Sequence, residues 1–398
     1  MSNTIEKHNN TRIEVIDILR GFAIMGIIIL HSIEHFNFYR FPSEVPFEWM
    51  KFTDKAIWDG LFFAFGGKAY AIFALLFGFS FYIQYNNEQQ RGRDFRLRFL
   101  WRLVLLFVLG QFNAAFFTGE ILTMYAMIGI ILPLCCKMSN KHLITVAIIL
   151  LLQPMEWAKV INAIMNPDYI TPKGINYWAI TSKAQSEGTF WEMLKVNLWE
   201  GQLASLKWAW QHGRIFQTAG LFLSGLWLGR TKLFTYSKEH SLVWHKYLLF
   251  AVVLFFPLNG IHSMLPDYIS NKEILKPLQL IIKSYANICV MIMLSVMVVM
   301  AYYYSSKKKL TLWLAPYGRM SLTNYISQSI IGALFFYNWG FNLNIGITYS
   351  FLFGIALFIV QLTFCTIWLK HFSHGPFEIV WKYFTWMGSK RKQAEKRN

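Results

Sequence analysis

The stretch of sequence that decides the fold is EVIDILRGFAIMGIIILHSIE, residues 14–34. Its apolar character predicts a membrane-spanning helix, yet it carries Arg20 and His31 with ten uncharged residues between them. Eleven helical residues advance about 16 Å and turn through three revolutions plus about 20°. Asp17, Arg20 and His31 are therefore predicted on one face, with Arg20 near a membrane boundary and His31 about half a bilayer deeper. Ionisable groups are costly in lipid and usually serve a site, so this helix predicts a reaction centre.

The composition of the chain is that of a polytopic membrane protein. Of its 398 residues, 55% are hydrophobic and only 15% are charged, and long apolar runs recur from end to end. The net charge of +17 lies in short clusters beside apolar runs, as in cytoplasmic loops, so nucleic acid is not an expected partner. The four cysteines fall in or at the edge of apolar runs without a CxxC spacing, and no metal-ligand spacing is present. We therefore expect neither a disulfide framework nor a metal.

The apolar runs predict an all-α bundle of about ten transmembrane helices that forms a single domain over residues 1–398. The expected spans lie near 14–34, 62–85, 98–117, 121–137, 141–158, 211–229, 245–262, 277–304, 316–338 and 345–369. Basic clusters follow the second, sixth and eighth spans and fill the tail at 387–398. Ten spans and a cytoplasmic 1–13 segment would place every cluster inside, with both termini cytoplasmic.

The segment 159–210 has a different pattern, with mixed charge and many tryptophans. The tryptophans are Trp178, Trp191, Trp199, Trp208 and Trp210. We expect interfacial amphipathic helices that cap the bundle on the extracytoplasmic side. Their aromatic rings fit the headgroup level of a membrane, and a carbohydrate-stacking surface is the alternative.

A second polar constellation lies in the third expected span. Eleven residues separate Arg102 from Asn113, so Asn113 is predicted at the depth of His31. Gln111 lies just before Asn113, and Glu120 follows in the break after this span. A buried imidazole suits a general base, with Asn113 or Glu120 fixing its orientation. The alternatives are a hydrogen-bonded core histidine and a solvated loop acid.

Further polar residues in or beside the spans are candidate substrate ligands. Glu34 makes the outer end of the first helix polar. Lys68 enters the second span after a glycine pair, as either a snorkelling lysine or a ligand for an anionic group. Ser321, Asn324 and Gln328 recur at i, i+3 and i+7, which predicts one polar stripe on a helix. The stripe fits a substrate path and interhelical hydrogen bonding equally well.

Five segments of the chain resemble the YeiB-like bacterial membrane proteins, known as domain of unknown function 418. These segments are Asp17–Ala23, Leu75–Gly78, Gly119–Leu122, Gly318–Tyr325 and Gly375–Glu378. The resemblance covers nearly the whole chain and implies kinship with transmembrane acyltransferases. These include the heparan-α-glucosaminide N-acetyltransferase and the acyltransferase-3 family, in which an Arg is followed eleven positions on by a His needed for acyl transfer. Arg20 and His31 match that spacing.

One departure from the resemblance concerns the histidine. YeiB-like proteins usually have Asn at the position of His31 and His at the position of Asn113, and many have Asp at the position of Glu120. The histidine and the asparagine are thus exchanged between two helices. Such an exchange is easiest to understand if the two side chains meet.

The residues and the resemblance together predict an acyltransferase of the bacterial cytoplasmic (inner) membrane. An acyl group, with acetyl as the first expectation, would pass from cytoplasmic acyl-CoA to a hydroxyl or amine of an extracytoplasmic glycan, lipid headgroup or small metabolite. His31 would be the base, by direct transfer or through an acyl-histidine. The expected coenzyme ligands are Arg20, Arg98, Arg102 and Arg319.

Two other classes of protein remain open. In a proton-coupled transporter, His31, Glu34 and Glu120 would form a relay and the polar stripe would line the substrate path. A non-catalytic assembly or sensor protein is the third class. The expected partners are membrane lipids and the acyl acceptor, and a homodimer stays open.

Overall fold

The computed structural model describes residues 13–38, 47–172, 174–235, 237–304 and 309–388. The first half contains α1 (Glu14–Ile33), α2 (Trp49–Ala64), α3 (Ala69–Gln90), α4 (Arg96–Ala114), α5 (Leu122–Ile128), α6 (Ile131–Cys135), α7 (Asn140–Leu151), α8 (Pro154–Met165), α9 (Tyr177–Glu187) and α10 (Phe190–Val196). The second half contains a π-helical turn (Asn197–Gly201), α11 (Gln202–Gln211), α12 (Arg214–Thr231), α13 (Lys238–Tyr268), α14 (Lys272–Tyr304), α15 (Lys309–Leu312), α16 (Ala315–Arg319), α17 (Ser321–Phe336), α18 (Ile347–His371) and α19 (Pro376–Trp386). All regular elements in these ranges are helices, so the all-α prediction is confirmed.

Six helical segments in the described part of the chain are long and apolar enough to cross a membrane, which makes this a multi-pass membrane protein. The pair α7 and α8, bent by 46°, would supply a seventh span. The predicted count of about ten is therefore not confirmed. Where further spans were expected, α5 and α6 have only 7 and 5 residues, and α17 has 16. The expected cytoplasmic segment 1–13 and the basic tail lie almost entirely outside the described residues.

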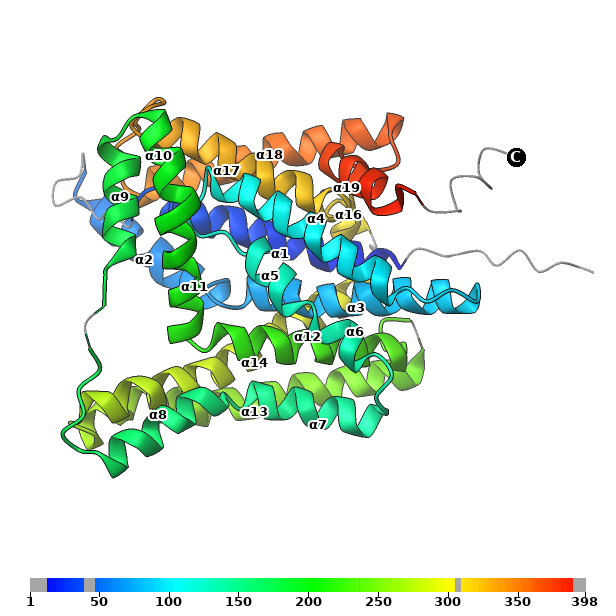
Figure 1. The fold of residues 1–398 in the computed structure, drawn as a ribbon, viewed down its shortest axis with the longest axis horizontal. Coiled ribbons are helices and arrows are strands. Elements are labelled where there is room, and N and C mark those ends of the chain that lie inside the picture. The colour runs from blue at the N-terminus through cyan, green and yellow to red at the C-terminus, as the bar shows by residue number, and fades with distance from the viewer. Residues whose placement is uncertain (1–12, 39–46, 173, 236, 305–308, 389–398) are drawn as a thin grey trace, which may run out of the picture.

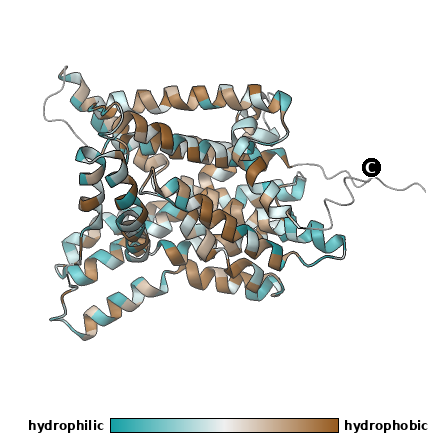
Figure 2. Ribbon diagram, turned by 45° about the horizontal axis from the view of Figure 1, so that its top comes forward, coloured by the Kyte–Doolittle hydropathy of each residue, from teal (hydrophilic) through white to brown (hydrophobic). Residues whose placement is uncertain are grey.

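The long helices run side by side, whereas α9, α10 and α11 lie across one end of the bundle (Figure 1). We call this the cap end. Hydrophobic residues dominate the middle of the helices and hydrophilic residues gather toward their ends (Figure 2). This distribution is the one that a helical membrane protein requires, because its middle faces hydrocarbon.

The opposite end of the bundle carries the basic residues that follow α3 and close α12, and we call it the basic end. The helices α3 and α12 run parallel, since a Cβ at Gly225 would lie 1.9 Å from the Leu75 carbonyl oxygen and one at Gly229 would lie 2.5 Å from the Tyr82 ring. The carboxyl ends of both helices, with Arg91 following α3 and Arg230 closing α12, therefore lie together. Two of the clusters predicted on one side thus share one end of the fold.

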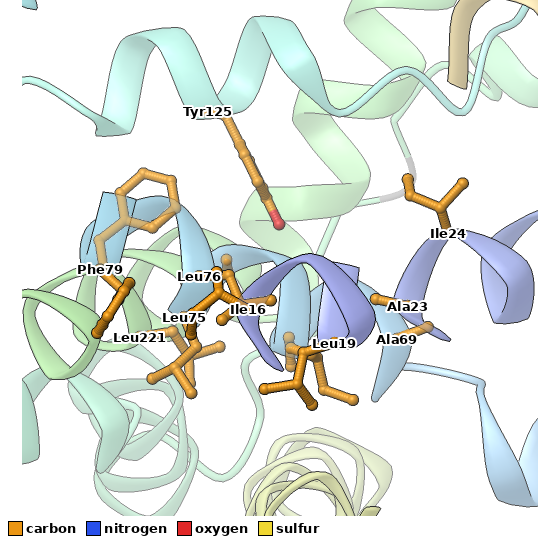
Figure 3. Packing of buried hydrophobic residues seen from close by; sticks show 14 of the residues in the cluster. Ile16, Leu19, Ala23, Ile24, Ala69, Leu75, Leu76, Phe79, Tyr125 and Leu221 are labelled. Carbon is orange, nitrogen blue, oxygen red and sulfur yellow. The ribbon is translucent and has the colours of Figure 1, made fainter. Parts of the chain in front are cut away.

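The helix α1 lies at the centre of the bundle, packed against α3, α16 and α18. Its close approach to α16 depends on glycine: a Cβ at Gly21 would be 2.3 Å from the Leu314 carbonyl oxygen, and one at Gly318 would be 1.8 Å from that of Asp17. Apolar side chains of α1, α3, α5 and α12 meet beside this crossing (Figure 3). Small residues let membrane helices approach closely, and here they bring Arg20 and Arg319 toward one space.

Candidate functional site

Two cavities lie end to end inside the bundle. The first, of about 370 Å³, lies toward the basic end, and we call it the basic-end cavity. The second, of about 950 Å³, is covered by α9 and α11, and we call it the cap-end cavity. Ile27, Tyr70 and Ile121 line both cavities, so the two spaces share a wall of three side chains.

The basic-end cavity contains three of the four arginines predicted to bind a coenzyme. Arg20 bonds to Asp17 at 3.2 Å, which confirms the predicted pair on α1, and also contacts Ser80. The guanidinium of Arg102 stacks on the Trp381 ring at 4.1 Å, and Arg319 donates to the Ser373 carbonyl at 3.1 Å. The rest of the lining is mostly aliphatic and aromatic. The cavity thus combines cations with a narrow apolar interior.

His31 lines the cap-end cavity and lies among aromatic rings. Its ring centroid is 4.7 Å from that of Phe117 and 5.5 Å from that of His35. The Nδ1 atom of His31 is buried and makes no hydrogen bond to a described residue. The alternative considered from the sequence, a hydrogen-bonded core histidine, gains no support at this nitrogen.

Two carboxyl groups line the same cavity. Glu34 lies 3.4 Å from His35 Nε2, and burial raises the pKa of Glu34 to about 8 while it lowers that of His35 to about 4. Glu120 caps α5 by accepting the N–H groups of Leu122 and Thr123, the latter at 2.8 Å. Burial raises the pKa of Glu120 to about 7, although these N–H donors oppose the effect. Both acids therefore change charge near neutral pH.

Among the described residues, no hydrogen bond joins His31 to Asn113 or Glu120. Asn113 is fully buried, its side chain makes no hydrogen bond to a described residue, and it lines neither cavity. Phe117, one turn beyond Asn113, is the residue of this segment that packs on His31. The contact between His31 and Asn113 that would explain the exchange of these two residue types relative to YeiB-like proteins stays a prediction.

Several other predicted site residues lie away from both cavities. Arg98 bonds to the carbonyls of residues 385 and 387, Gln111 donates to the Thr123 hydroxyl at 3.1 Å, and Gln328 is buried without a hydrogen-bond partner. Asn324 donates to the Tyr317 carbonyl at 2.9 Å, as interhelical packing requires. Of the predicted polar stripe on α17, Ser321 alone lines a cavity.

A polar network in the shared wall could not be foreseen from the sequence. Arg214, the first residue of α12, donates to the Tyr70 hydroxyl at 2.9 Å and to Gln217 Oε1 at 2.8 Å. The Tyr70 hydroxyl also bonds to Gln217, whose amide donates to the Ser284 hydroxyl at 3.0 Å. Three helices distant in sequence are joined here. The signal available in the sequence was Arg214 at the start of an apolar run, which also fits a boundary anchor.

The tryptophan-rich segment divides into two groups. Trp178 and Trp208 line the cap-end cavity, and their rings lie 5.9 Å from His35 and 4.9 Å from His212. Trp191 and Trp199 are instead 76% and 70% exposed on the outside, where they fit a membrane interface.

The segments that carry the family resemblance meet around the basic-end cavity. Glu378 accepts the N–H groups of Leu322 at 2.8 Å and Thr323 at 3.1 Å, so it caps the start of α17. The Tyr325 hydroxyl, from the same helix, accepts the N–H of Ile121 at 3.3 Å. These contacts tie Gly119–Leu122, Gly318–Tyr325 and Gly375–Glu378 into one wall.

The comparisons with known proteins agree with this architecture. The model for the heparan-alpha-glucosaminide N-acetyltransferase catalytic region matches residues 12–185, and the model described as a protein of unknown function (DUF418) matches residues 228–388. The first match contains His31 and Glu120, and the second contains Arg319 and Glu378. No solved structure matches the chain significantly.

Three curated relatives are similar over nearly their full lengths. The uncharacterized protein YeiB of Escherichia coli is 26% identical and covers 93% of this chain and 95% of its own length. The uncharacterized protein YxaH of Bacillus subtilis is 26% identical over 98% of this chain and 99% of its own length. An uncharacterized 39.9 kDa protein encoded beside an amylase in Bacillus acidopullulyticus is 26% identical over 94% of each chain. The resemblance to YeiB-like proteins and to the N-acetyltransferase family is therefore confirmed, and the chain has a transferase-like membrane domain.

Proposed function

We propose that this protein is a transmembrane acyltransferase that takes an acyl group, acetyl in the first place, from acyl-CoA. The observation that carries the proposal is the pair of adjoining cavities, one containing three arginines and the other containing His31. The match to an N-acetyltransferase catalytic region supports the reaction class. The donor would enter from the basic end, on the cytoplasmic side, and the acceptor from the cap end.

The basic-end cavity fits part of the donor. Its modest volume and apolar lining suit the thioester arm of a coenzyme, and Arg20, Arg102 and Arg319 suit the phosphates that follow it. The nucleotide would then remain outside the bundle. The thioester would reach the shared wall formed by Ile27, Tyr70 and Ile121.

In the proposed reaction, His31 removes the proton from the acceptor hydroxyl or amine as that group attacks the thioester carbonyl carbon. A carbon–oxygen or carbon–nitrogen bond forms, the carbon–sulfur bond breaks, and the coenzyme thiolate leaves and takes up a proton. The Tyr325 hydroxyl accepts the Ile121 N–H, so its own proton can be donated to the carbonyl oxygen as negative charge develops there. Glu120 would accept the acceptor's proton from His31 and pass it on to the leaving thiolate, so that both groups return to their starting protonation states.

The test is acyl transfer by the purified protein from radiolabelled acetyl-CoA to an extract of envelope glycans and lipids. We expect His31→Ala to lower transfer by about 10²–10⁴-fold, the usual contribution of a general base, while acetyl-CoA binding is retained. The matched control is His142→Ala, because His142 lies at the start of α7 and bonds to Ser139 outside both cavities. Full turnover by His31→Ala would exclude the proposed base. A wild-type protein that consumes no acetyl-CoA but shows pH-dependent uptake would be a transporter.

A further inference from the structure

The cap-end cavity contains a cluster of cations that the acyl-transfer step does not use. Lys68 from the start of α3, Arg214 from the start of α12 and Lys283 from α14 all line this cavity. They come from three helices, so the cluster is a product of the tertiary fold. Lys68 is only 6% exposed, which makes its charge costly without a ligand.

No carboxylate among the described residues lies within ion-pair distance of these three side chains. Lys68 donates to the Phe62 carbonyl at 3.2 Å, and Arg214 donates to neutral oxygens of Tyr70 and Gln217. The two acids of the cavity are engaged elsewhere, Glu34 with His35 and Glu120 with the backbone of α5. Burial also raises the pKa values of both acids, which reduces the negative charge that they carry near neutral pH.

The backbone around the cluster is shaped for close approach of a ligand. Gly67 has a φ of +76°, and a Cβ there would lie 3.1 Å from Arg214 Nη2 and 3.0 Å from Asn287 Nδ2. Two nitrogen donors therefore converge on the Gly67 backbone, and a side chain at this position would crowd them. Arg214 also lies at the positive end of the α12 dipole, which favours an anion.

The pKa of a neighbouring histidine is affected by the same positive charges. Burial lowers the pKa of His212, and the positive charges of Arg214, Lys159 and Lys283 lower it further. The contribution of Arg214, Lys159 and Lys283 to this shift shows that positive charge gathers on this side of the cavity.

We propose that the cap-end cavity binds an acceptor that carries a phosphate or phosphodiester group, held by Lys68, Arg214 and Lys283. The same cavity contains His31, so the anion would anchor the acceptor while its hydroxyl or amine faces the base. The role as an acceptor rests on the proposed acyltransferase function, whereas anion binding does not. Several donors from separate helices match the three or more oxygens of a phosphate.

This phosphate could belong to a membrane lipid or to a soluble molecule. A lipid would enter beside α2 and α13, where Phe63 and Phe255 both line the cavity with ring centroids 6.1 Å apart. Phe63 is 58% exposed, so this wall extends to the lipid-facing surface. A soluble acceptor would enter beneath the cap helices. The chemistry at the cations is the same in both cases.

The experiment measures binding of sn-glycerol 3-phosphate to the purified full-length protein, with glycerol as the uncharged comparison and no acyl-CoA present. We expect binding of the phosphate compound only, and about tenfold weaker binding for Lys283→Gln and for Lys68→Gln. The matched control is Lys183→Gln, an exposed lysine of α9 that lies outside the cavity and is expected to bind as wild type does. Should Lys68→Gln fail to fold, the exposed Lys283 still provides the test.

A second arm uses nanodiscs of phosphatidylglycerol or of phosphatidylcholine. Displacement of sn-glycerol 3-phosphate by phosphatidylglycerol, lost in Lys283→Gln, assigns the phosphate to a lipid headgroup, and its absence assigns it to a soluble acceptor. Equal binding of glycerol, or unchanged binding by both lysine variants, would overturn the proposal. Phosphate binding without acyl transfer would refute the proposed function but retain the anion site. Acyl transfer to neutral acceptors alone, without phosphate binding, would retain the proposed function but refute the anion site.

Discussion

The crossing of α1 and α16 provides a test of how the basic-end cavity is held. In Gly318→Ala the new Cβ would lie 1.8 Å from the Asp17 carbonyl oxygen, although ordinary contact begins at 3.4 Å. The helices must therefore separate by about 1.6 Å at this point, since the obstacle is backbone that cannot rotate away. Overpacking of this kind costs about 1–3 kcal/mol.

The separation of the two helices should also weaken binding of acetyl-CoA, because Gly318 and its neighbour Arg319 line the basic-end cavity together with Arg20 on the opposing helix. We expect Gly318→Ala to lower the melting temperature by several degrees and to weaken acetyl-CoA binding. The assay is thermal unfolding in detergent, followed by a binding titration of the protein that remains folded.

The matched control is Gly260→Ala in α13, where a Cβ would have no neighbour within 4 Å. Because alanine favours helix over glycine by up to about 1 kcal/mol, this variant should melt at or above the wild-type temperature. A Gly318→Ala protein as stable as Gly260→Ala would refute the argument that this glycine fixes the crossing.

Two further predictions concern charge. Arg102→Gln should weaken acetyl-CoA binding about tenfold in a titration at low salt, whereas Arg98→Gln should bind as wild type does because Arg98 lies outside the cavity. Since the pKa of Glu34 is raised from 4.5 to about 8, its neutral form stabilises the fold, and stability falls by up to about 1.4 kcal/mol per pH unit until pH 8. His35, with its pKa lowered from 6.5 to about 4, offsets this fall below pH 6.5, and Glu120, with its pKa raised to about 7, adds a fall of its own up to pH 7. Unfolding midpoints of wild type should therefore drop between pH 7 and 8, where those of Glu34→Gln change much less. A fall of equal size in Glu34→Gln would contradict the assignment.

Local spacing along one helix was the part of the site that could be predicted from the sequence. Asp17, Arg20 and His31 share α1, and helical geometry alone relates residues three and eleven positions apart. The Asp17–Arg20 hydrogen bond follows from that spacing. The apolar runs likewise predict the all-α bundle, because a chain in lipid must satisfy its backbone within helices.

Relations between helices could not be predicted in the same way. Equal depth for His31 and Asn113 follows from residue counts, but depth does not fix which face of α4 turns toward α1, and Phe117 lies against the imidazole instead. The predicted span count is not confirmed for a related reason. An apolar run predicts burial but not length, and α5, α6 and α17 are shorter than a bilayer requires.

The network of Arg214, Tyr70 and Gln217 connects the two halves of the proposed mechanism. Tyr70 forms part of the wall between the cavities, and its hydroxyl is held by the guanidinium that also belongs to the cation cluster. A substitution of Arg214 would therefore disturb the wall, the anion site and the start of α12 together. Lys283 contributes charge to the cluster but makes no hydrogen bond to Tyr70 or Gln217 in the described part of the chain, so its removal changes the positive charge alone. Substitution of Lys283 should thus lower acyl transfer only through the loss of anion binding. Any larger loss of acyl transfer on substitution of Arg214 measures what this arginine contributes by holding Tyr70 in the wall.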